Sequence, residues 1–390
     1  MARSLIGDSP FQRLAALLEG IPSGMTPINL SLGEPHHRYP EVAARAIAAD
    51  LDPLGAYPAA AGTPAFRQAI ANWACRRFEL GHLDPQTEIT ALCGSREGLF
   101  LAAVTAALES GKKDPVALLP NPFYQSYGAG IVAAGLSPVL LDAHAGNNHL
   151  PDIENVAPDI LERTVLAFFA SPSNPAGTVA SAERLRSIVD TARRHDFYLF
   201  ADECYSELYQ SAPPAGALSV SEEGNFSKVC VFNSLSKRSN LPGLRCGFAA
   251  GDPAFIKALI RMRNLCGPQV PVPLQNAAIA AYGDEVHVAE NRRLYAAKFD
   301  LADEIIGTWP GYRRPEAGFF LWLDVGALGG GESFALRAWQ EAGLRFIPGA
   351  YLGRRGSDGV NPGDDYVRIA LVDDLDLTET ALARLARLLN

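Results

Sequence analysis

The chain has 390 residues, of which 48 % are hydrophobic and 20 % are charged, and its formal net charge is −9. This length exceeds what one compact core holds, so we expect a globular protein of about two or three domains. The acidic balance and the absence of long Lys or Arg runs argue against binding of nucleic acids or anionic membranes.

The cysteines and the N-terminus indicate the compartment. The six cysteines are scattered and form neither a CxxC pair nor a Cys/His cluster, which predicts reduced thiols and no metal site. The sequence has no basic-then-apolar leader and no apolar stretch of about 18 residues. We therefore expect a cytoplasmic protein.

Residues 1–45 are punctuated by Pro and Gly and hold one strand candidate, Ile28–Leu32. We expect this segment to pack beside the C-terminal domain. In the predicted large domain, residues 46–282, short apolar runs alternate with amphipathic stretches such as Ala182–His195. The strand candidates are Pro115–Leu119, Pro138–Leu141, Thr164–Ala170, Tyr198–Ala201, Lys228–Phe232 and Arg245–Ala249. Near-continuous apolar runs are typical of a parallel sheet that is buried on both faces.

The pattern changes after residue 282 and indicates a smaller α+β domain over residues 283–390. Its predicted elements are a helix at Glu285–Ile306, a strand at Gly318–Leu323, a helix at Glu332–Ala342, a strand at Tyr366–Leu371 and a helix at Asp376–Leu389. The predicted fold class is thus α/β, with a three-layer αβα large domain around a mostly parallel sheet and a smaller α+β domain.

One motif follows directly on a buried strand candidate: Ser234-Leu-Ser-Lys-Arg-Ser-Asn-Leu-Pro-Gly-Leu-Arg245. It places Lys237 on a loop at a strand's C-terminal end, where open α/β sheets bind ligands. These residues could hold a phosphate dianion, with Ser234 and Ser236 as donors and Arg245 as a bidentate clamp. We expect these charges to depress the pKa of the Lys237 amine and so to favour imine formation.

Other polar motifs end neighbouring strands. Asp202, in Phe200-Ala-Asp202-Glu-Cys-Tyr205, is a carboxylate suited to hold a pyridine nitrogen protonated. Tyr205 and Asn174, the latter in Ser171-Pro-Ser-Asn174-Pro-Ala-Gly177, are hydrogen-bonding groups for a phenolic oxygen on the same ring.

A glycine turn, Gly94-Ser95-Arg96-Glu97-Gly98, precedes a predicted helix at Leu99–Leu108. Free N–H groups at a helix start are suited to bind phosphate. Tyr124, in Asn121-Pro-Phe-Tyr124, is a ring that can stack on a cofactor.

In this order the motifs resemble fold-type I aminotransferases of the class I/II family over nearly all of the chain. The resemblance implies pyridoxal 5′-phosphate as the cofactor. It implies catalytic roles for Lys237 as Schiff base and proton shuttle, for Asp202 at the pyridine nitrogen and for Tyr205, with Asn174, at the phenolic oxygen. Tyr124 would stack on the ring, and phosphate contacts would come from Ser95, Arg96, Ser234, Ser236 and Arg245.

The resemblance extends to three further segments. Leu30-Ser-Leu-Gly33-Glu-Pro35 is similar to the strand whose glycine lies against the substrate, and Tyr366-Val-Arg368 to the segment whose arginine binds the substrate α-carboxylate together with Asn174. Ala56-Tyr57-Pro resembles the segment whose tyrosine reaches the partner's phosphate. This implies a homodimer with shared active sites.

Three stretches resemble succinyldiaminopimelate aminotransferases: residues 33–40, 235–252 and 283–299. The resemblance implies amino transfer between N-succinyl-LL-2,6-diaminopimelate and 2-oxoglutarate, on the lysine and cell-wall route. His36 and Tyr282 stand where that group commonly has lysine and tryptophan. A long dicarboxylic substrate needs a second cationic contact, for which Arg38 and Arg96 are candidates.

Other functions stay open on the same scaffold. An aminotransferase for another amino acid or a pyridoxal-phosphate carbon–sulfur lyase would keep every cofactor residue. A regulatory protein would need a DNA-binding module, for which the early start of the aminotransferase resemblance leaves no room. A Rossmann dinucleotide protein is disfavoured, because no GxGxxG motif follows a predicted strand.

Overall fold

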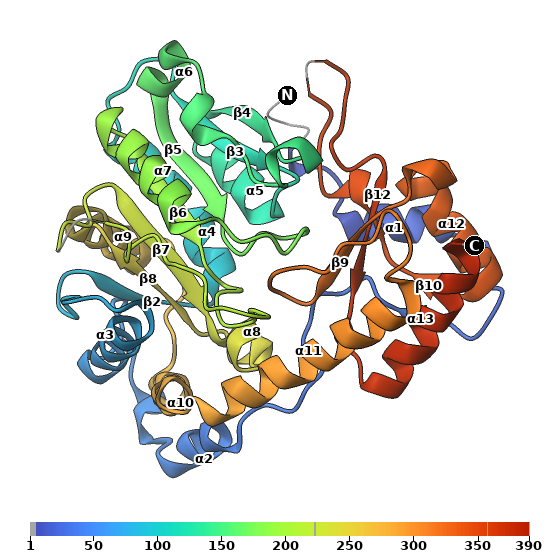
Figure 1. Ribbon diagram of the computed structural model, residues 1–390. Coiled ribbons are helices and arrows are strands. Elements are labelled where there is room, and N and C mark those ends of the chain that lie inside the picture. The colour runs from blue at the N-terminus through green and yellow to red at the C-terminus, as the bar shows by residue number, and fades with distance from the viewer. Residues whose placement is uncertain (1–4, 222–223, 357, 390) are drawn as a thin grey trace.

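The computed structural model describes residues 5–221, 224–356 and 358–389. A seven-stranded sheet in the order β2-β8-β7-β6-β5-β3-β4 forms the centre of the larger body (Figure 1). All its strands are parallel except β8, which runs antiparallel to both neighbours. The strands are β2 (Ile89–Leu92), β3 (Val116–Asn121), β4 (Ser137–Asp142), β5 (Thr164–Ala170), β6 (Tyr198–Asp202), β7 (Val229–Ser234) and β8 (Gly247–Gly251). The predicted α/β class with a mostly parallel sheet is confirmed.

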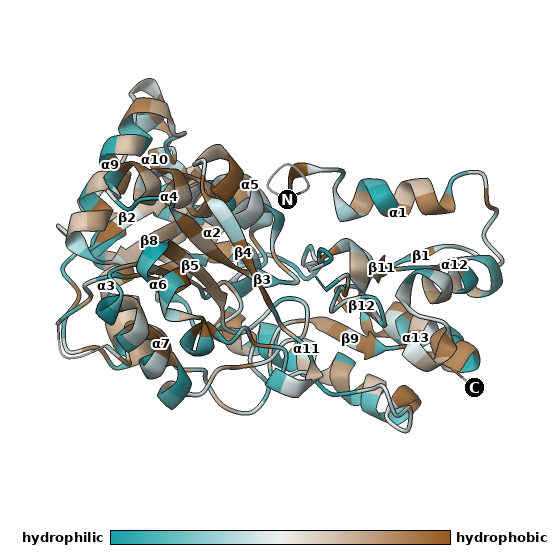
Figure 2. Ribbon diagram, turned by 90° about the horizontal axis from the view of Figure 1, so that it is seen from above, coloured by the Kyte–Doolittle hydropathy of each residue, from teal (hydrophilic) through white to brown (hydrophobic). Residues whose placement is uncertain are grey.

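Helices cover both faces of this sheet, because successive strand residues point to opposite sides. Phe169 belongs to a core cluster with the helices on one face, and its neighbour Phe168 belongs to a second cluster on the other face. The first cluster includes α3 (Pro64–Phe78), α7 (Ala182–Arg194) and α10 (Val272–Gly283), and the second includes α4 (Ser95–Glu109), α5 (Gln125–Ala133) and α9 (Pro253–Cys266). Figure 2 shows hydrophobic residues along β3 and β5, between these layers.

Two predictions for the seven-stranded sheet differ from the structure, and outside this sheet the strand predicted at Ile28–Leu32 spans only Ile28–Asn29. Strand β2 was not predicted, because it has only four residues and runs directly into the Gly94 turn. The strand predicted at Arg245–Ala249 begins two residues later, at Gly247. Arg245 has a φ of 53°, a left-handed conformation that a strand cannot contain.

The smaller body is built from C-terminal and N-terminal residues together. Its three-stranded antiparallel sheet has the order β11-β12-β9, and β1 of the N-terminal segment pairs in parallel with β10. The strands are β1 (Ile28–Asn29), β9 (Phe320–Asp324), β10 (Leu344–Arg345), β11 (Ile347–Pro348) and β12 (Tyr366–Ala370). The helices are α1 (Pro10–Leu18), α12 (Gly331–Ala342) and α13 (Leu375–Leu389).

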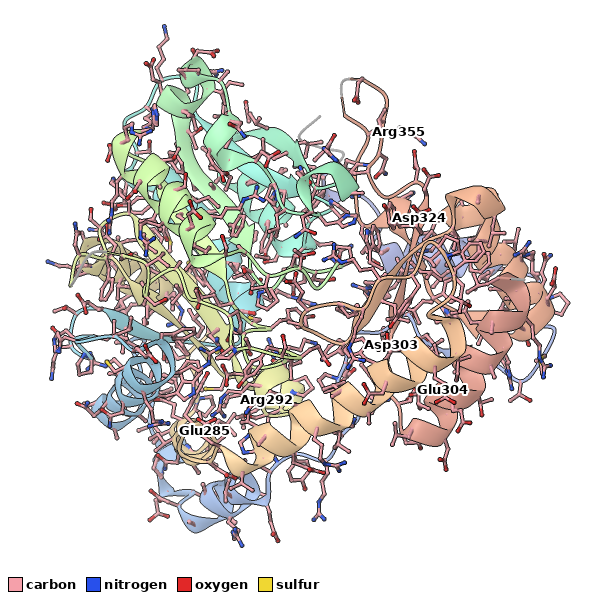
Figure 3. The ribbon with its side chains drawn as sticks, in the orientation of Figure 1. Glu285, Arg292, Asp303, Glu304, Asp324 and Arg355 are labelled. Atoms are coloured by element: carbon pink, nitrogen blue, oxygen red, sulfur yellow. The ribbon has the colours of Figure 1, made fainter. Side chains whose placement is uncertain are left out.

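Helix α11 (Val286–Ile306) connects the two bodies. Figure 3 places Glu285 and Arg292 beside the larger body, and Asp303 and Glu304 beside the smaller one. The predicted boundary at residue 282 falls at the end of α10, whereas residue 45 lies inside α2 (Glu41–Ala49), which lies beside α10 in Figure 1. The domain boundaries themselves stay a prediction.

The remaining helices of the larger body are short: α6 (Pro158–Arg163) before β5, and α8 (Leu235–Arg238) after β7. Within the described ranges, no helix is long and apolar enough to cross a membrane. In the same part of the chain, no group of three or more His, Cys, Asp or Glu side chains is placed to hold a metal ion.

Candidate active site

A cavity of about 240 Å³ lies between the two bodies. The larger body contributes Ala170, Asp202 and Lys237 to its lining, all at or just after the carboxyl ends of β5, β6 and β7. The smaller body contributes Phe320 and Arg368 from β9 and β12. This is the sheet edge at which open α/β folds bind ligands.

Lys237 lies in helix α8 rather than on the loop that the sequence predicted. Ser234 caps this short helix by accepting a hydrogen bond from the Ser236 backbone N–H at 3.1 Å. The Lys237 amine donates to the carbonyl oxygen of Gly33 and lies 5.2 Å from the centre of the Phe319 ring.

The Lys237 amine is shielded from water, and charged side chains also lie near it, of which Glu34 raises its pKa. Burial lowers the pKa of Lys237 to about 8, and the nearby Arg368 and Arg96 act in the same direction. The direction of the predicted shift is correct, but the main cause is loss of water rather than neighbouring charge.

Asp202 has a partner that the sequence did not indicate. The Tyr127 hydroxyl donates to Asp202 Oδ2 at 2.5 Å, and the backbone N–H of Cys204 donates to Oδ1 at 3.1 Å. The Tyr127 ring is buried and stacks on Phe168 with ring centres 4.4 Å apart. The carboxylate is therefore held in one orientation at the floor of the cavity.

Arg368 and Asn174 meet across the cavity. Arg368 Nη1 donates to Asn174 Oδ1 at 3.3 Å, and Nη2 donates to the Ser31 carbonyl oxygen at 3.0 Å. Its Nε is buried and has no hydrogen-bond partner among the described residues, and burial lowers the pKa of Arg368 to about 10. A buried guanidinium with an unsatisfied donor suits a carboxylate ligand.

The predicted phosphate residues gather around the start of α4. This helix begins at Ser95, earlier than predicted, and Gly94 before it provides no side-chain cap for the first N–H groups. Arg245 packs so closely on Gly94 that a Cβ there would lie 2.2 Å from Arg245 Nη2. Arg245 also donates to the Cys93 carbonyl oxygen at 3.1 Å. Gly94 has a φ of 80°, a conformation that favours glycine. The uncapped donors of the turn lie beside a guanidinium, as a phosphate dianion needs.

Ser234 and Ser236 face each other, with their Oγ atoms 2.9 Å apart. The cavity lining includes Ser95 and Arg96 but not Ser234, Ser236 or Arg245. The buried amine, the fixed carboxylate and this group of donors together fit pyridoxal phosphate, which the sequence resemblance implied.

Of the other predicted residues, Arg96, Tyr124, Gly33 and Tyr205 line the cavity, whereas Tyr57 and Arg38 do not. Arg96 donates from Nε to the Tyr124 hydroxyl at 2.7 Å, and both residues line the cavity. Gly33 also lines it, and a Cβ there would lie 2.5 Å from Phe320 Cζ. Tyr57 is 99 % exposed, and Arg38 is exposed and outside the lining.

Tyr205 completes the predicted set. It lines the cavity, and its ring packs edge-on against Phe319, with ring centres 5.5 Å apart. Burial raises the pKa of Tyr205, while Arg368 opposes the shift. The hydroxyl is thus kept protonated and able to donate a hydrogen bond.

Sequence reasoning missed Tyr127, Trp322 and His149, which also line the cavity. Tyr127 had a signal, because it follows Tyr124 by three residues at the start of a helix and so lies on the same face. Trp322 and His149 come from separate parts of the chain, and no local pattern joins them.

Comparisons with known proteins agree with this geometry. The family model described as aminotransferase class I and II matches residues 26–385. The LL-diaminopimelate aminotransferase of Desulforudis audaxviator (strain MP104C) is 34 % identical over 356 residues, 89 % of this chain and 86 % of that protein. The 4-dedimethylamino-4-oxo-anhydrotetracycline transaminase OxyQ of Streptomyces rimosus is 34 % identical over 382 residues, 96 % of each. The crystal structure of an aminotransferase from Neisseria meningitidis Z2491 covers 100 % of both chains at 37 % identity, with a TM-score of 0.94.

Replacing Tyr127 by Phe should weaken cofactor binding by about 10- to 100-fold, because a hydrogen bond to a buried charge is worth about 1.5–3 kcal/mol. Titrating the cofactor-free protein with pyridoxal phosphate and following the visible absorbance measures this. Tyr198→Phe is the matched control, because it removes a hydroxyl outside the cavity lining. An unchanged dissociation constant for Tyr127→Phe would contradict the role of the hydroxyl.

The rate of covalent cofactor uptake should rise with pH through about 8 and then level off, because only the neutral Lys237 amine attacks a carbonyl. Stopped-flow absorbance of the cofactor-free protein mixed with pyridoxal phosphate gives this profile. A rate that keeps rising towards the ordinary lysine pKa of 10.5 would show that the amine is solvated.

Proposed function

The chain belongs to the class I and II aminotransferases, and from this we propose that it transfers an amino group from N-succinyl-LL-2,6-diaminopimelate to 2-oxoglutarate. Members of this family are pyridoxal-phosphate enzymes, so transamination is the premise and the identity of the substrate is the proposal. The reaction would belong to lysine and cell-wall biosynthesis.

The charge of the cavity lining carries this proposal. Asp202 is the one carboxylate among the described lining residues, and both of its oxygens already accept hydrogen bonds. Free diaminopimelate carries a distal ammonium group, which is costly to bury without an acceptor. Succinylation turns that ammonium into a neutral amide and adds a carboxylate, which a lining rich in donors suits better.

The apolar part of the cavity lining supports the proposal of a long substrate. Phe11, Trp322 and Leu352 supply apolar walls for a methylene chain, and Arg96 and His149 are polar groups in the same lining. Of the two contacts predicted for the terminal succinyl carboxylate, Arg96 lines the cavity and Arg38 lies outside it. We therefore propose Arg96 as a contact of this carboxylate in addition to its role at the phosphate, since a guanidinium has several donors.

The side chains have the following proposed roles in the half-reactions. Bound pyridoxal phosphate supplies an electron-withdrawing ring that stabilises negative charge at the substrate α-carbon. Lys237 binds the cofactor covalently and then moves a proton as general base and acid. Asp202 holds the pyridine nitrogen protonated, and Asn174 and Tyr205 donate to the phenolic oxygen.

The remaining assignments concern binding. Arg368 orients the substrate α-carboxylate with its guanidinium fork, beside Gly33 and Asn174. Tyr124 stacks on the cofactor ring. Phosphate contacts come from Ser95, Arg96, Ser234, Ser236, Arg245 and Tyr57 of the partner subunit, so the proposal includes a homodimer.

A second candidate substrate is LL-diaminopimelate itself. The observation that favours it is the name shared by relatives such as those of Desulforudis audaxviator and Moorella thermoacetica, which are 34 % and 32 % identical to this chain. The two candidate donors differ at the distal nitrogen, which is a charged ammonium in LL-diaminopimelate and a neutral amide with an added carboxylate in the succinylated compound.

Glutamate formation from 2-oxoglutarate, measured with each donor in turn, separates the two. We expect kcat/KM for succinyldiaminopimelate to exceed that for LL-diaminopimelate by about 100-fold, because the free ammonium would be left unpaired. Equal or reversed values would favour the second candidate. Pyruvate from cystathionine, without glutamate from either donor, would instead identify a carbon–sulfur lyase.

Lys237→Ala should remove the imine absorbance band of the bound cofactor and lower turnover by about 10²- to 10⁴-fold, the usual contribution of acid–base catalysis. Circular dichroism and thermal melting check that the fold is retained. Cofactor that stays attached to the variant after borohydride reduction and denaturation would show that another lysine binds it covalently.

A further inference from the structure

His37 lies between the N-terminal loop and α11, outside the cavity described above. Its Nδ1 is 2.9 Å from Asn291 Oδ1, and its Nε2 is 2.7 Å from Lys298 Nζ. Its ring packs on Tyr295, with ring centres 4.5 Å apart. Because Asn291, Tyr295 and Lys298 follow one another at intervals of four and three residues, one face of α11 surrounds this imidazole.

The donor and the acceptor of each hydrogen bond at His37 can be assigned. A lysine ammonium has only donors, so Lys298 donates and Nε2 accepts. Nδ1 must then carry the hydrogen, and it donates to Asn291 Oδ1. The Asn291 Nδ2 donates in turn to the carbonyl oxygens of Lys237 at 3.3 Å and Arg238 at 3.4 Å. A series of hydrogen bonds therefore runs from Lys298 through His37 and Asn291 to the backbone carbonyl groups of α8.

The same loop also contacts the Lys237 side chain. Gly33, four residues before His37, accepts a hydrogen bond from the Lys237 amine through its carbonyl oxygen. His36, next to His37, contacts Asp373 at 2.6 Å, just beyond β12. Residues 33–37 thus contact the Lys237 amine through Gly33, α8 through His37 and Asn291, and the smaller body through His36.

Lys298 is a buried lysine, which is unusual because burial disfavours a charged amine. Its residue is 1 % exposed, and among the described residues it has no carboxylate within 4.0 Å. Burial lowers the pKa of Lys298 to about 8, and Asp373 and Asp374 oppose the shift. An amine buried without a close carboxylate lowers stability. The polar contact that Lys298 makes here is the 2.7 Å hydrogen bond to His37 Nε2, which points to a positional role.

We propose that His37 is a positioning residue: through Asn291 it fixes the position of α8, which carries Lys237, and it connects α8 to the N-terminal loop. Lys298 holds the His37 imidazole in the one tautomer that allows these hydrogen bonds. The inference rests on the aminotransferase reaction and not on the succinylated substrate. It goes beyond the proposed function, because none of these three side chains touches the cavity.

Protonation of His37 interrupts this series of hydrogen bonds. A hydrogen on Nε2 removes the acceptor for Lys298 and brings two cations together. Burial lowers the pKa of His37, Asn291 opposes this, and the charged groups that face it are Lys298 and His36, which lower it, and Glu290, which raises it. A lowered pKa means that the neutral form persists below the ordinary value of 6.5, and activity is lost as pH falls through the lowered value.

Four variants test the proposal, with kcat and KM measured from pH 5 to 9 using whichever amino donor supports turnover. His37→Ala should lower kcat by about 10- to 100-fold and change KM by less than about threefold, as expected for misplacement of a catalytic group. His37→Gln keeps an acceptor and a donor but does not titrate, so most of kcat should return and the loss at acidic pH should be reduced.

Lys298→Met, which keeps the length without the charge, should move the acidic loss to higher pH, because the cation that disfavours protonation of His37 is gone. His82→Gln is the control, because it removes an exposed histidine of the larger body. Its pH profile should match that of the unchanged enzyme. Thermal melting identifies any variant that has lost its fold.

Imidazole nitrogen NMR of the cofactor-free, ¹⁵N-histidine-labelled protein gives a readout besides activity. We expect a neutral His37 with hydrogen on Nδ1, and a higher pKa for it in Lys298→Met. A neutral Nε2–H form, an unmoved pH profile in Lys298→Met, or a kcat for His37→Ala within about twofold of normal would each overturn the proposal. A change of preferred amino donor would overturn only the proposed substrate.

Discussion

The burial of one amine is the constraint on which the site depends. Lys237 follows β7, a strand buried along its whole length, and its amine meets the Gly33 carbonyl oxygen inside the cavity. A charged ammonium is unfavourable in such surroundings, so its pKa falls to about 8. Gly33 comes from the N-terminal segment and α8 from the larger body, so the amine is correctly placed only when the two bodies come together.

The sheet sets the other distances. Asp202 pairs with Ala170 of β5 on one side and with Phe232 of β7 on the other. This register brings the Asp202 carboxylate, the Asn174 loop after β5 and the Lys237 turn to one edge. Tyr127 then fixes the carboxylate by a hydrogen bond, and its ring is held by stacking on Phe168. Core packing thus orients a polar group of the site.

Residues of the smaller body complete the cavity lining through contacts with the larger body. Arg368 on β12 reaches Asn174 of the larger body and Ser31 of the N-terminal segment. Helix α11 contacts both bodies as well, since Glu285 next to its start pairs with Arg238 at 2.8 Å and Asp303 near its end pairs with Arg314. The network around His37 uses the middle of this helix. The Arg368 contacts and the α11 contacts thus both join the larger body to the smaller one.

By itself the sequence determined the α/β class, most strand and helix positions, the cofactor and the residues at the strand ends. It did so because buried parallel strands are locally apolar, and because motifs such as Asp202-x-x-Tyr205 and Ser234-x-Ser-Lys237 are short. Only the tertiary structure decided that Tyr127 holds Asp202, that Arg38 lies outside the cavity, and that Lys298 contacts His37. These contacts join residues 75 to 261 positions apart. Contacts at such separations depend on how packed elements meet, which no local pattern of residues specifies.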